Sequence, residues 1–161
     1  MAKFLVIVES PAKAKTISQY LGPEFNVRAS VGHIADLPSK GMAVDVDNGF
    51  APTYELTERG KTVVKELKDL LKSSDALYLA TDEDREGESI SWHLLQHLKP
   101  KVPVHRMVFH EINAKSIQEA VANPRELDQP LVDAAETRRI LDRLFGYEVS
   151  PVLWRRVNRG L

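Results

Sequence analysis

The sequence predicts an α/β fold, with a sheet of about four mainly parallel strands flanked by helices and followed by a helical C-terminal extension. Apolar, β-branched runs of strand length occur at residues 4–9, 26–32, 76–82 and 104–111. Segments in which apolar residues recur with helical spacing lie between them. The repeat of strand, turn and helix is typical of parallel strands joined by crossover helices.

The first strand leads into the first helix through a turn with clear signals. Phe4 to Val8 are all apolar, and Glu9 stands at the C-terminal end of this run. Ser10 is suited to cap a helix and Pro11 fits the first helical position, so a helix over 11–21 is predicted to begin at once. Ligands of open parallel sheets bind beyond the carboxyl ends of the strands, which is where Glu9 is expected.

Four further helices are predicted, at residues 57–72, 86–98, 114–122 and 131–145. In the second of these, Ile90, Leu94 and Leu98 recur every four residues and should face the sheet. Gly146 is placed to end the last helix. Residues 123–130, which contain two prolines, are the predicted linker between a domain over 1–125 and the start of a second, helical domain over 126–161.

Composition excludes several classes of protein. The 161 residues are 43% hydrophobic and 28% charged, which is ordinary for one soluble globular domain with a small appendage. Without cysteine there is no disulfide, thiolate metal site or thiol nucleophile. No apolar run reaches membrane-spanning length, and the start leads into a strand and not a signal peptide. We therefore expect a cytoplasmic protein that does not enter membranes.

An acidic cluster is the most informative feature of the chain. Five carboxylates occupy the seven residues from Asp82 to Glu88, directly after the apolar run 76–80. Hard oxygen ligands at the end of a strand are what Mg²⁺ requires. The alternative is a solvated helix start, since acids favour the positive end of the helix dipole, but that explains two or three acids better than five. Glu9, at another strand end, is predicted to share one ion with Asp82.

Two cations adjoin these acids. Lys13 falls in the first turn of the helix after Glu9, where the helix dipole disfavours a positive charge. It is either a solvated lysine or, beside the acidic cluster, a point charge for a phosphate. Arg85 either clamps a nucleic acid or relieves repulsion among its acidic neighbours, and we favour the second interpretation.

The histidines divide into two groups. His33 follows Gly32 at another predicted strand end and either faces the same crevice or is a hydrogen-bonded bystander. His93 and His97 stand four apart on one helix, a spacing that can bind zinc. No further ligand is predictable near them, so we interpret both as partly exposed helix residues.

The C-terminal segment is basic. Residues 138–159 hold six arginines against only Asp142 and Glu148. Arg139 and Arg143 share one helix face, Arg138 pairs with Asp142, and Arg155, Arg156 and Arg159 continue the basic segment. The segment is either a solvated helix with ordinary ion pairs or a track for single-stranded nucleic acid that contacts the backbone with little sequence preference.

Several motifs resemble the bacterial type IA DNA topoisomerases. Residues 8–17 (VESPAKAKTI) are similar to the opening motif of that family, and residues 81–88 (TDEDREGE) to its version of the Toprim motif. VGHI at 31–34, FHEI at 109–112 and RRILDRLFGY at 138–147 resemble further blocks, in the family order. The likeness covers essentially the whole chain. Glu136 departs from the family pattern, in which glutamine is frequent.

The resemblance implies a Toprim fold, with a Rossmann-like sheet, in an enzyme that relaxes negatively supercoiled DNA without ATP through a transient single-strand break and a 5′-phosphotyrosine. Asp82 and Asp84 would be the principal Mg²⁺ ligands, joined by Glu9 and Glu86. Glu9 and Lys13 would be catalytic, with Glu9 moving a proton at the 3′ oxygen and Lys13 contacting the scissile phosphate. His33 and the predicted arginine track, together with Asp142, would contact single-stranded DNA. The partners would be DNA and the remaining domains of the same polypeptide, in a monomer on the nucleoid.

The tyrosine nucleophile of that family has no counterpart here. Tyr20, Tyr54, Tyr78 and Tyr147 match none of its active-site context, so we expect an N-terminal fragment that is inactive alone. Two other classes remain open: a self-contained Toprim nuclease or primase-like enzyme, against which the 10–17 motif argues, and a non-catalytic DNA-binding module, in which binding would depend on the arginines alone.

Overall fold

A four-stranded parallel sheet forms the body of the molecule. The computed structural model describes residues 2–157. Its sheet has the order β2-β1-β7-β8, with strands β1 (Phe4–Val8), β2 (Phe25–Ala29), β7 (Ala76–Leu79) and β8 (Val104–Arg106). Every pairing is parallel, as the sequence predicted. Each strand ends one to five residues earlier than expected, and the residues beyond these ends carry the candidate site.

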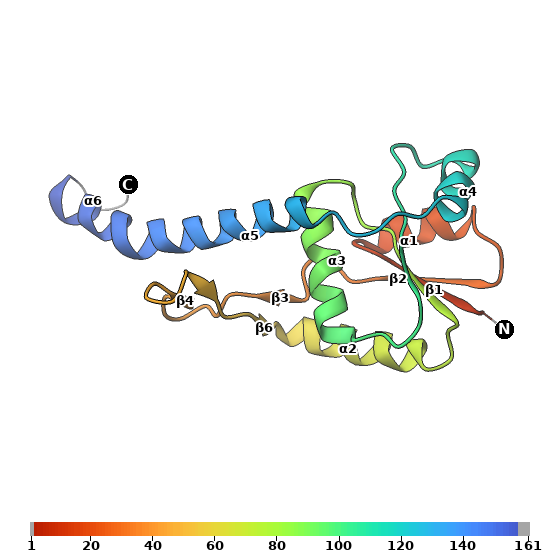
Figure 1. The fold of residues 1–161 in the computed structure, drawn as a ribbon, viewed down its shortest axis with the longest axis horizontal. Helices are drawn as coiled ribbons and strands as arrows, with labels where there is room; N and C mark the ends of the chain where they lie inside the picture. The colour runs from red at the N-terminus through yellow and green to blue at the C-terminus, as the bar shows by residue number, and fades with distance from the viewer. Residues whose placement is uncertain (1, 158–161) are drawn as a thin grey trace.

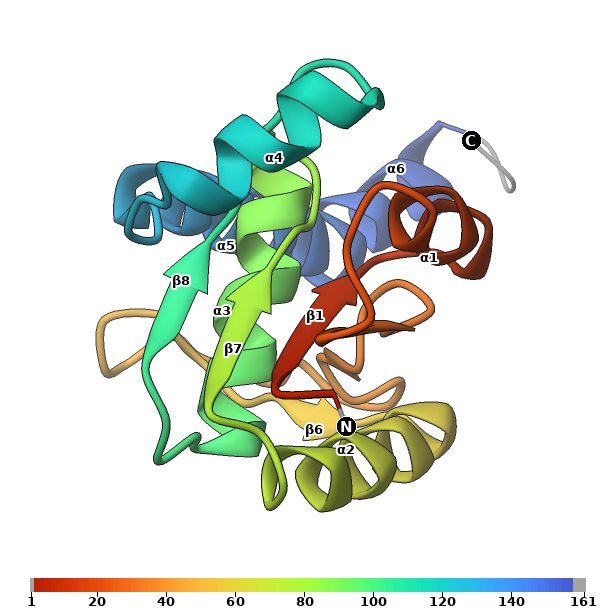
Figure 2. The same ribbon diagram turned by 90° about the vertical axis from the view of Figure 1, so that its right-hand side faces the viewer.

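Helices cover both faces of this sheet. Figure 2 looks onto the sheet with α1 (Pro11–Ser18) and α4 (Ala114–Ala122) on the near side and α3 (Arg85–Leu98) behind it. Alternate residues of β1 divide between two cores because successive side chains point to opposite faces. Leu5 and Ile7 pack with apolar residues of α2 (Glu58–Leu71) and α3, including Val64 and Leu94, while Val6 and Val8 pack with Ile17 of α1 and Ile117 of α4. The predicted α/β layers are therefore confirmed.

Side-chain caps fix where the helices begin. The side chains of Ser10, Thr57, Asp84, Asn113 and Asp128 each accept a hydrogen bond from a backbone N–H in the first turn of α1, α2, α3, α4 and α5 (Gln129–Leu144), respectively. These caps satisfy donors that have no partner within the helix. The cap at Ser10 was predicted from the sequence.

A two-part ribbon over residues 35–56 was not predicted. It consists of two antiparallel ladders of two residues a strand, one pairing β3 (Ala35–Asp36) with β6 (Glu55–Leu56) and the other pairing β4 (Val44–Asp45) with β5 (Ala51–Pro52). Figure 1 shows the ribbon running alongside α5, away from the sheet. The arrangement leaves a long, narrow part of the molecule beyond the sheet and its helices.

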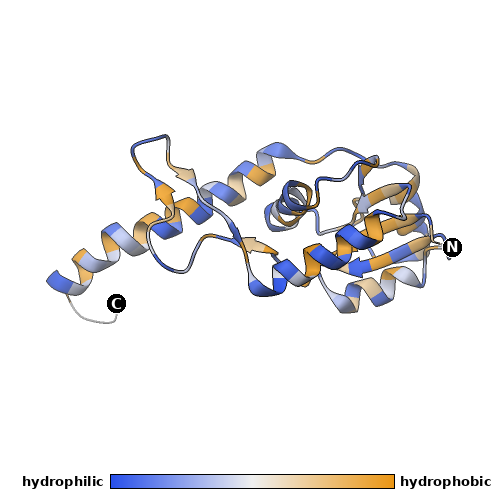
Figure 3. Ribbon diagram, turned by 90° about the horizontal axis from the view of Figure 1, so that it is seen from below, coloured by the Kyte–Doolittle hydropathy of each residue, from blue (hydrophilic) through white to orange (hydrophobic). Residues whose placement is uncertain are grey.

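The C-terminal helix does not end at Gly146, so that prediction was wrong. Helix α5 passes directly into a π-helical turn over Phe145–Val149 and then into α6 (Ser150–Arg156). Pro151 has no N–H and therefore cannot donate a hydrogen bond to the preceding turn of helix. The π-helical turn lies where this missing bond interrupts the regular α-helical hydrogen bonds. Figure 3 shows hydrophobic and hydrophilic residues mixed along this helical extension. Leu141, Phe145 and Val157 are each more than half exposed.

The predicted linker is a short connection that is tied to the sheet. Arg125 forms an isolated antiparallel bridge with Arg106 of β8, with two N–H···O distances of 2.9 Å. The side chain of Glu88 on α3 accepts hydrogen bonds from Arg125 and from the backbone N–H of Asp128. The division into domains at residue 125 stays a prediction. None of the helices described over residues 2–157 is long and apolar enough to cross a membrane.

Candidate metal and nucleic-acid site

The loops after the parallel strands meet at one edge of the sheet. Glu9 follows β1, and its Oε2 accepts a hydrogen bond of 2.9 Å from the backbone N–H of Asp82, which follows β7. Val31 and Gly32, after β2, both have positive φ and turn the chain back, with Gly32 N–H donating to the Glu9 carbonyl. This reversal brings His33 toward the acidic residues. Three of the predicted site residues, Glu9, His33 and Asp82, therefore lie at the same edge of the sheet.

Lys13 joins two of the predicted metal ligands. Its Nζ lies 2.6 Å from Glu9 Oε1 and 2.6 Å from Asp82 Oδ1. The lysine side chain is only 11% exposed, whereas that of Asp82 is 61% exposed. Nζ also lies 5.2 Å from the centre of the Phe109 ring, within cation–π range. Two carboxylates thus converge on one cation at the strand ends.

The four predicted metal ligands are not gathered around one point. Asp84 Oδ1 caps α3 by accepting from Gly87 N–H, and Glu86 Oε2 lies 2.8 Å from His33 Nε2. Over residues 2–157, no three Asp, Glu or His side chains form a group able to hold a metal ion. Carboxylate oxygens are the kind of ligand that Mg²⁺ prefers, and the ammonium of Lys13 already lies between those of Glu9 and Asp82 at the two strand ends.

His33 links the acidic residues to α5. Arg139 Nη2 lies 2.6 Å from His33 Nδ1, and because a guanidinium is always a donor, Nδ1 must accept. The ring proton therefore stands on Nε2 and is donated to Glu86. Burial, assisted by the charge of Arg139 and opposed by Glu86, lowers the pKa of His33, so the imidazole is neutral. The bond from His33 lowers the pKa of Glu86.

The predicted arginine track divides into inward and outward members. Arg139 lies 3.6 Å from Asp36 and Arg143 Nη1 donates to the carbonyls of Pro38 and Gly41, so both hold the ribbon against α5. With Asp142 they line a groove of about 330 Å³ between these two elements. Three other members are exposed: Arg138, which pairs with Asp142 at 4.0 Å, and Arg155 and Arg156 on α6. Arg159 lies outside the described residues.

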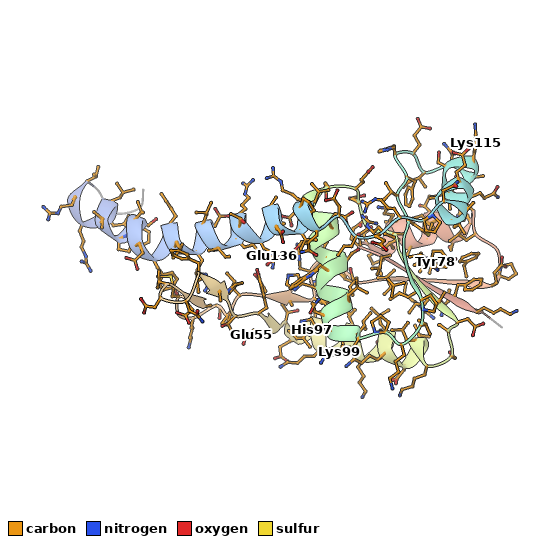
Figure 4. The ribbon with its side chains drawn as sticks, viewed as in Figure 1. Glu55, Tyr78, His97, Lys99, Lys115 and Glu136 are labelled. Carbon is orange, nitrogen blue, oxygen red and sulfur yellow. The ribbon has the colours of Figure 1, made fainter. Side chains whose placement is uncertain are left out.

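His93 is buried, so its interpretation as a partly exposed residue was wrong. It is 1% exposed, and its Nε2 lies 3.2 Å from Glu136 Oε1, which also accepts a hydrogen bond of 2.8 Å from Ser89. Figure 4 places Glu136 on α5 where that helix meets α3. Burial, with repulsion from Arg139, His33 and His97, lowers the pKa of His93 to about 3. The spacing of apolar residues on α3 did not predict that His93 is buried, because its partner is the polar side chain of Glu136 on another helix.

Glutamine at position 136 is expected to stabilise the fold at alkaline pH. Burial raises the pKa of Glu136, and its Oε2 is buried without a hydrogen-bond partner among residues 2–157. A raised pKa stabilises the fold below the ordinary glutamate value and costs stability as pH rises through the folded pKa. Glu136→Gln should therefore gain about 1 kcal/mol over wild type at about pH 8, and less near pH 4.5. Urea unfolding at both pH values measures this.

A control separates this effect from a general change of charge. Glu119 on α4 is exposed, and its only described ion pair is a loose one of 3.9 Å with Lys115 among the residues that the structure covers. Glu119→Gln should leave the pH profile of stability unchanged. A Glu136→Gln variant whose advantage is the same at both pH values would contradict the assignment of a buried, titrating carboxyl.

Comparison with known proteins identifies the family. A sequence model of the Toprim domain matches residues 4–112. The chain belongs to the Toprim family. This Toprim chain is 64% identical to DNA topoisomerase 1 of Streptomyces coelicolor over 95% of its length, and 57% identical to that of Synechococcus elongatus over 98%. It also resembles the full-length topoisomerase I of Thermotoga maritima, with 49% identity, a TM-score of 0.86 and 94% of this chain covered.

The Toprim chain is much shorter than these relatives. It spans 17% of the Streptomyces protein, 19% of the Synechococcus protein and 26% of the Thermotoga chain. The matched family segment includes Glu9, Lys13, His33 and the acidic cluster, whereas the arginines of α5 and α6 lie after it. The prediction of a Toprim fold with a parallel sheet of about four strands is confirmed.

Proposed function

We propose that this chain is the Mg²⁺-binding part of a type IA DNA topoisomerase. The complete enzyme relaxes negatively supercoiled DNA without ATP by passing strands through a break held by a 5′-phosphotyrosine. A tyrosine outside this chain supplies the nucleophile, so the chain alone is inactive. Residues 1–125 form the Toprim domain, and 126–161 begin a helical DNA-binding domain. The protein works as a monomer in the cytoplasm, on the nucleoid.

One observation carries this proposal. Glu9 and Asp82 are 73 residues apart, yet both contact the ammonium of Lys13 at the carboxyl ends of neighbouring strands. A solvated acidic helix start would not require Glu9 to accept a hydrogen bond from the backbone N–H of Asp82. The arrangement supports a site where carboxylates, a lysine and a phosphate act together.

The residues at the strand ends divide the chemistry between them. Bound Mg²⁺ would offset phosphate charge and orient its oxygens, held by Asp82 and Asp84 with Glu9 and Glu86 close by. Glu9 would give a proton to the 3′ oxygen during cleavage and take it back during rejoining. Lys13 supplies a point charge to the scissile phosphate. Neutral His33 keeps Glu86 turned toward α5.

The α5 groove is where we place the single strand. Arg139, Asp142 and Arg143 line it, and Arg138, Arg155 and Arg156 extend positive charge along the outer surface. Arginines arranged in this way hold phosphates through counterion release with little preference for base. The contact between His33 and Arg139 would connect the single-stranded DNA in this groove with the proposed metal site.

Removing both acids of the Asp-x-Asp pair tests the proposal. Asp82→Asn with Asp84→Asn should abolish Mg²⁺ binding by the 161-residue chain in isothermal titration and supercoil relaxation by the complete polypeptide. Glu83→Gln is the matched control, since Glu83 belongs to the same acidic run but pairs with exposed His110 at 3.2 Å. Normal relaxation by the double variant would sink the metal assignment. Metal-dependent nicking of single-stranded DNA by the chain alone would favour a self-contained nuclease instead.

A further inference from the structure

Arg106 is a fully buried arginine that lies beneath the acidic loop. Its side chain is 1% exposed, and it is the largest of the completely buried side chains among the described residues. The guanidinium makes five polar contacts, equal to its number of N–H groups. Nη1 donates to the carbonyls of Leu79 and Met107, Nη2 to the carbonyl of Asp82, and Nε to Glu88. Nη2 also lies 2.8 Å from Glu88 Oε1 as an ion pair.

The bond to Asp82 fixes the backbone of a predicted metal ligand. Arg106 Nη2 lies 2.7 Å from the Asp82 carbonyl oxygen, while the Asp82 N–H donates to Glu9. The peptide groups on both sides of the Asp82 α-carbon are therefore held by side chains from other strand ends. Because both peptide groups are held, Asp82 can change only its side-chain torsions. Its carboxylate contacts Lys13 and is otherwise open to solvent.

Glu88 gives Arg106 a partner and connects it to α5. Burial favours the neutral form of Glu88, but hydrogen bonds from Arg125 and Arg106 prevail and lower its pKa. The carboxylate also accepts from the N–H of Asp128, the residue that caps α5. Arg125 contacts Glu88 without contacting Asp82. The network thus has one branch toward the acidic loop and another toward the helix of the arginine track.

We propose that Arg106 is a positioning residue that holds the Asp82 loop in the orientation required for binding a divalent cation. Lysine cannot replace it, because three N–H donors on a flexible stem cannot reach three carbonyls and a carboxylate in one plane. This inference rests on the proposed function, since the cation is the one assigned to Asp82 and Asp84. It adds a residue outside the acidic motif to the determinants of that site.

Two variants of the 161-residue chain separate the branches. Arg106→Lys should weaken Mg²⁺ binding by about tenfold in isothermal titration. Losses of this size are usual when a residue that hydrogen-bonds a metal ligand is replaced. Without metal, it should also speed amide hydrogen exchange at residues 82–87. Arg125→Met removes the other branch and should leave both measurements close to wild type. Circular dichroism establishes that each variant is folded.

A second variant tests the inference if the Arg106→Lys protein does not fold. Replacing both members of the buried pair, with Arg106→Met and Glu88→Met, removes the two buried charges together. Arg125 also loses its partner Glu88, but its side chain is 31% exposed and stays in contact with water. This double variant should show the same loss of Mg²⁺ affinity and the same faster exchange. Wild-type Mg²⁺ affinity in a folded Arg106 variant would overturn the inference. Equal losses in the Arg106 and Arg125 variants would also overturn it, because the effect would then be general destabilisation.

The two readouts distinguish this inference from the function it builds on. If the wild-type chain binds no Mg²⁺, the proposed function fails at its metal. Hydrogen exchange in the absence of metal still decides whether Arg106, and not Arg125, orders the Asp82 loop. Unchanged exchange in the Arg106 variant would reject the positioning role by itself.

Discussion

Replacing Gly87 with alanine is expected to lower the free energy of unfolding by about 3 kcal/mol, because the new methyl group overpacks a site with no space. An added Cβ would stand 1.9 Å from the Asp82 carbonyl oxygen and 2.7 Å from its carbon. Both are backbone atoms that cannot rotate away, and Arg106 holds the same carbonyl. The start of α3 and the acidic loop must therefore separate. Thermal unfolding should show a decrease of roughly 6–12 °C in Tm.

Two other glycines provide controls for this prediction. Gly146→Ala meets no heavy atom within 4 Å and should leave Tm unchanged or slightly higher. Gly60→Ala places its Cβ 2.0 Å from the Ile34 carbonyl oxygen and should cost similar stability. Of the two clashing variants, only Gly87→Ala should also weaken Mg²⁺ binding in the chain that remains folded. Wild-type melting of Gly87→Ala would show that the loop adapts and does not fix Asp82.

The sheet and its helices were predictable because their signals are local. The apolar run of β1, the cap at Ser10 and the spacing of Ile90, Leu94 and Leu98 each report burial or capping within a few residues. The ribbon over 35–56 was missed because its strands are two residues long, too short for alternation to show. The helix end at Gly146 was misplaced because glycine was given more weight than the helical residues on both sides of it.

The site was predictable only where its residues end strands. Glu9 and Asp82 follow apolar runs, so the topology of a parallel sheet brings them together. The same logic does not find Arg106, which ends β8 but was expected inside the longer strand predicted over 104–111, nor Glu88, which looked like one more acid of the cluster. Their pairing at 2.8 Å is a tertiary contact that leaves no periodic pattern. Asp84 caps α3, as expected of an acid at a helix start, while the interpretation of the cluster as a metal site stays a prediction.

Replacing Lys13 with methionine is expected to have opposite effects on metal binding and on catalysis. The ammonium lies 2.6 Å from one carboxylate oxygen of Glu9 and 2.6 Å from one of Asp82, so it competes with Mg²⁺ for the same oxygens. Lys13→Met should therefore bind Mg²⁺ several-fold more tightly in titrations of the 161-residue chain. In the complete polypeptide, DNA cleavage should decrease by about 10²-fold, since a charge aimed at the phosphate is lost. The amount of covalent protein–DNA adduct measures this.

Lys15 is the matched control, because it lies on the same helix and is exposed. Lys15→Met should change neither Mg²⁺ affinity nor adduct formation beyond a small, salt-dependent loss of DNA binding. Loss of both metal binding and cleavage in Lys13→Met would indicate that the lysine only holds the two carboxylates together. Tighter metal binding with unchanged cleavage would indicate that it only fills the cation position. Lys13 contacts both carboxylates and is proposed to contact the phosphate as well, so only the combination of tighter metal binding and lost cleavage fits a residue that serves both.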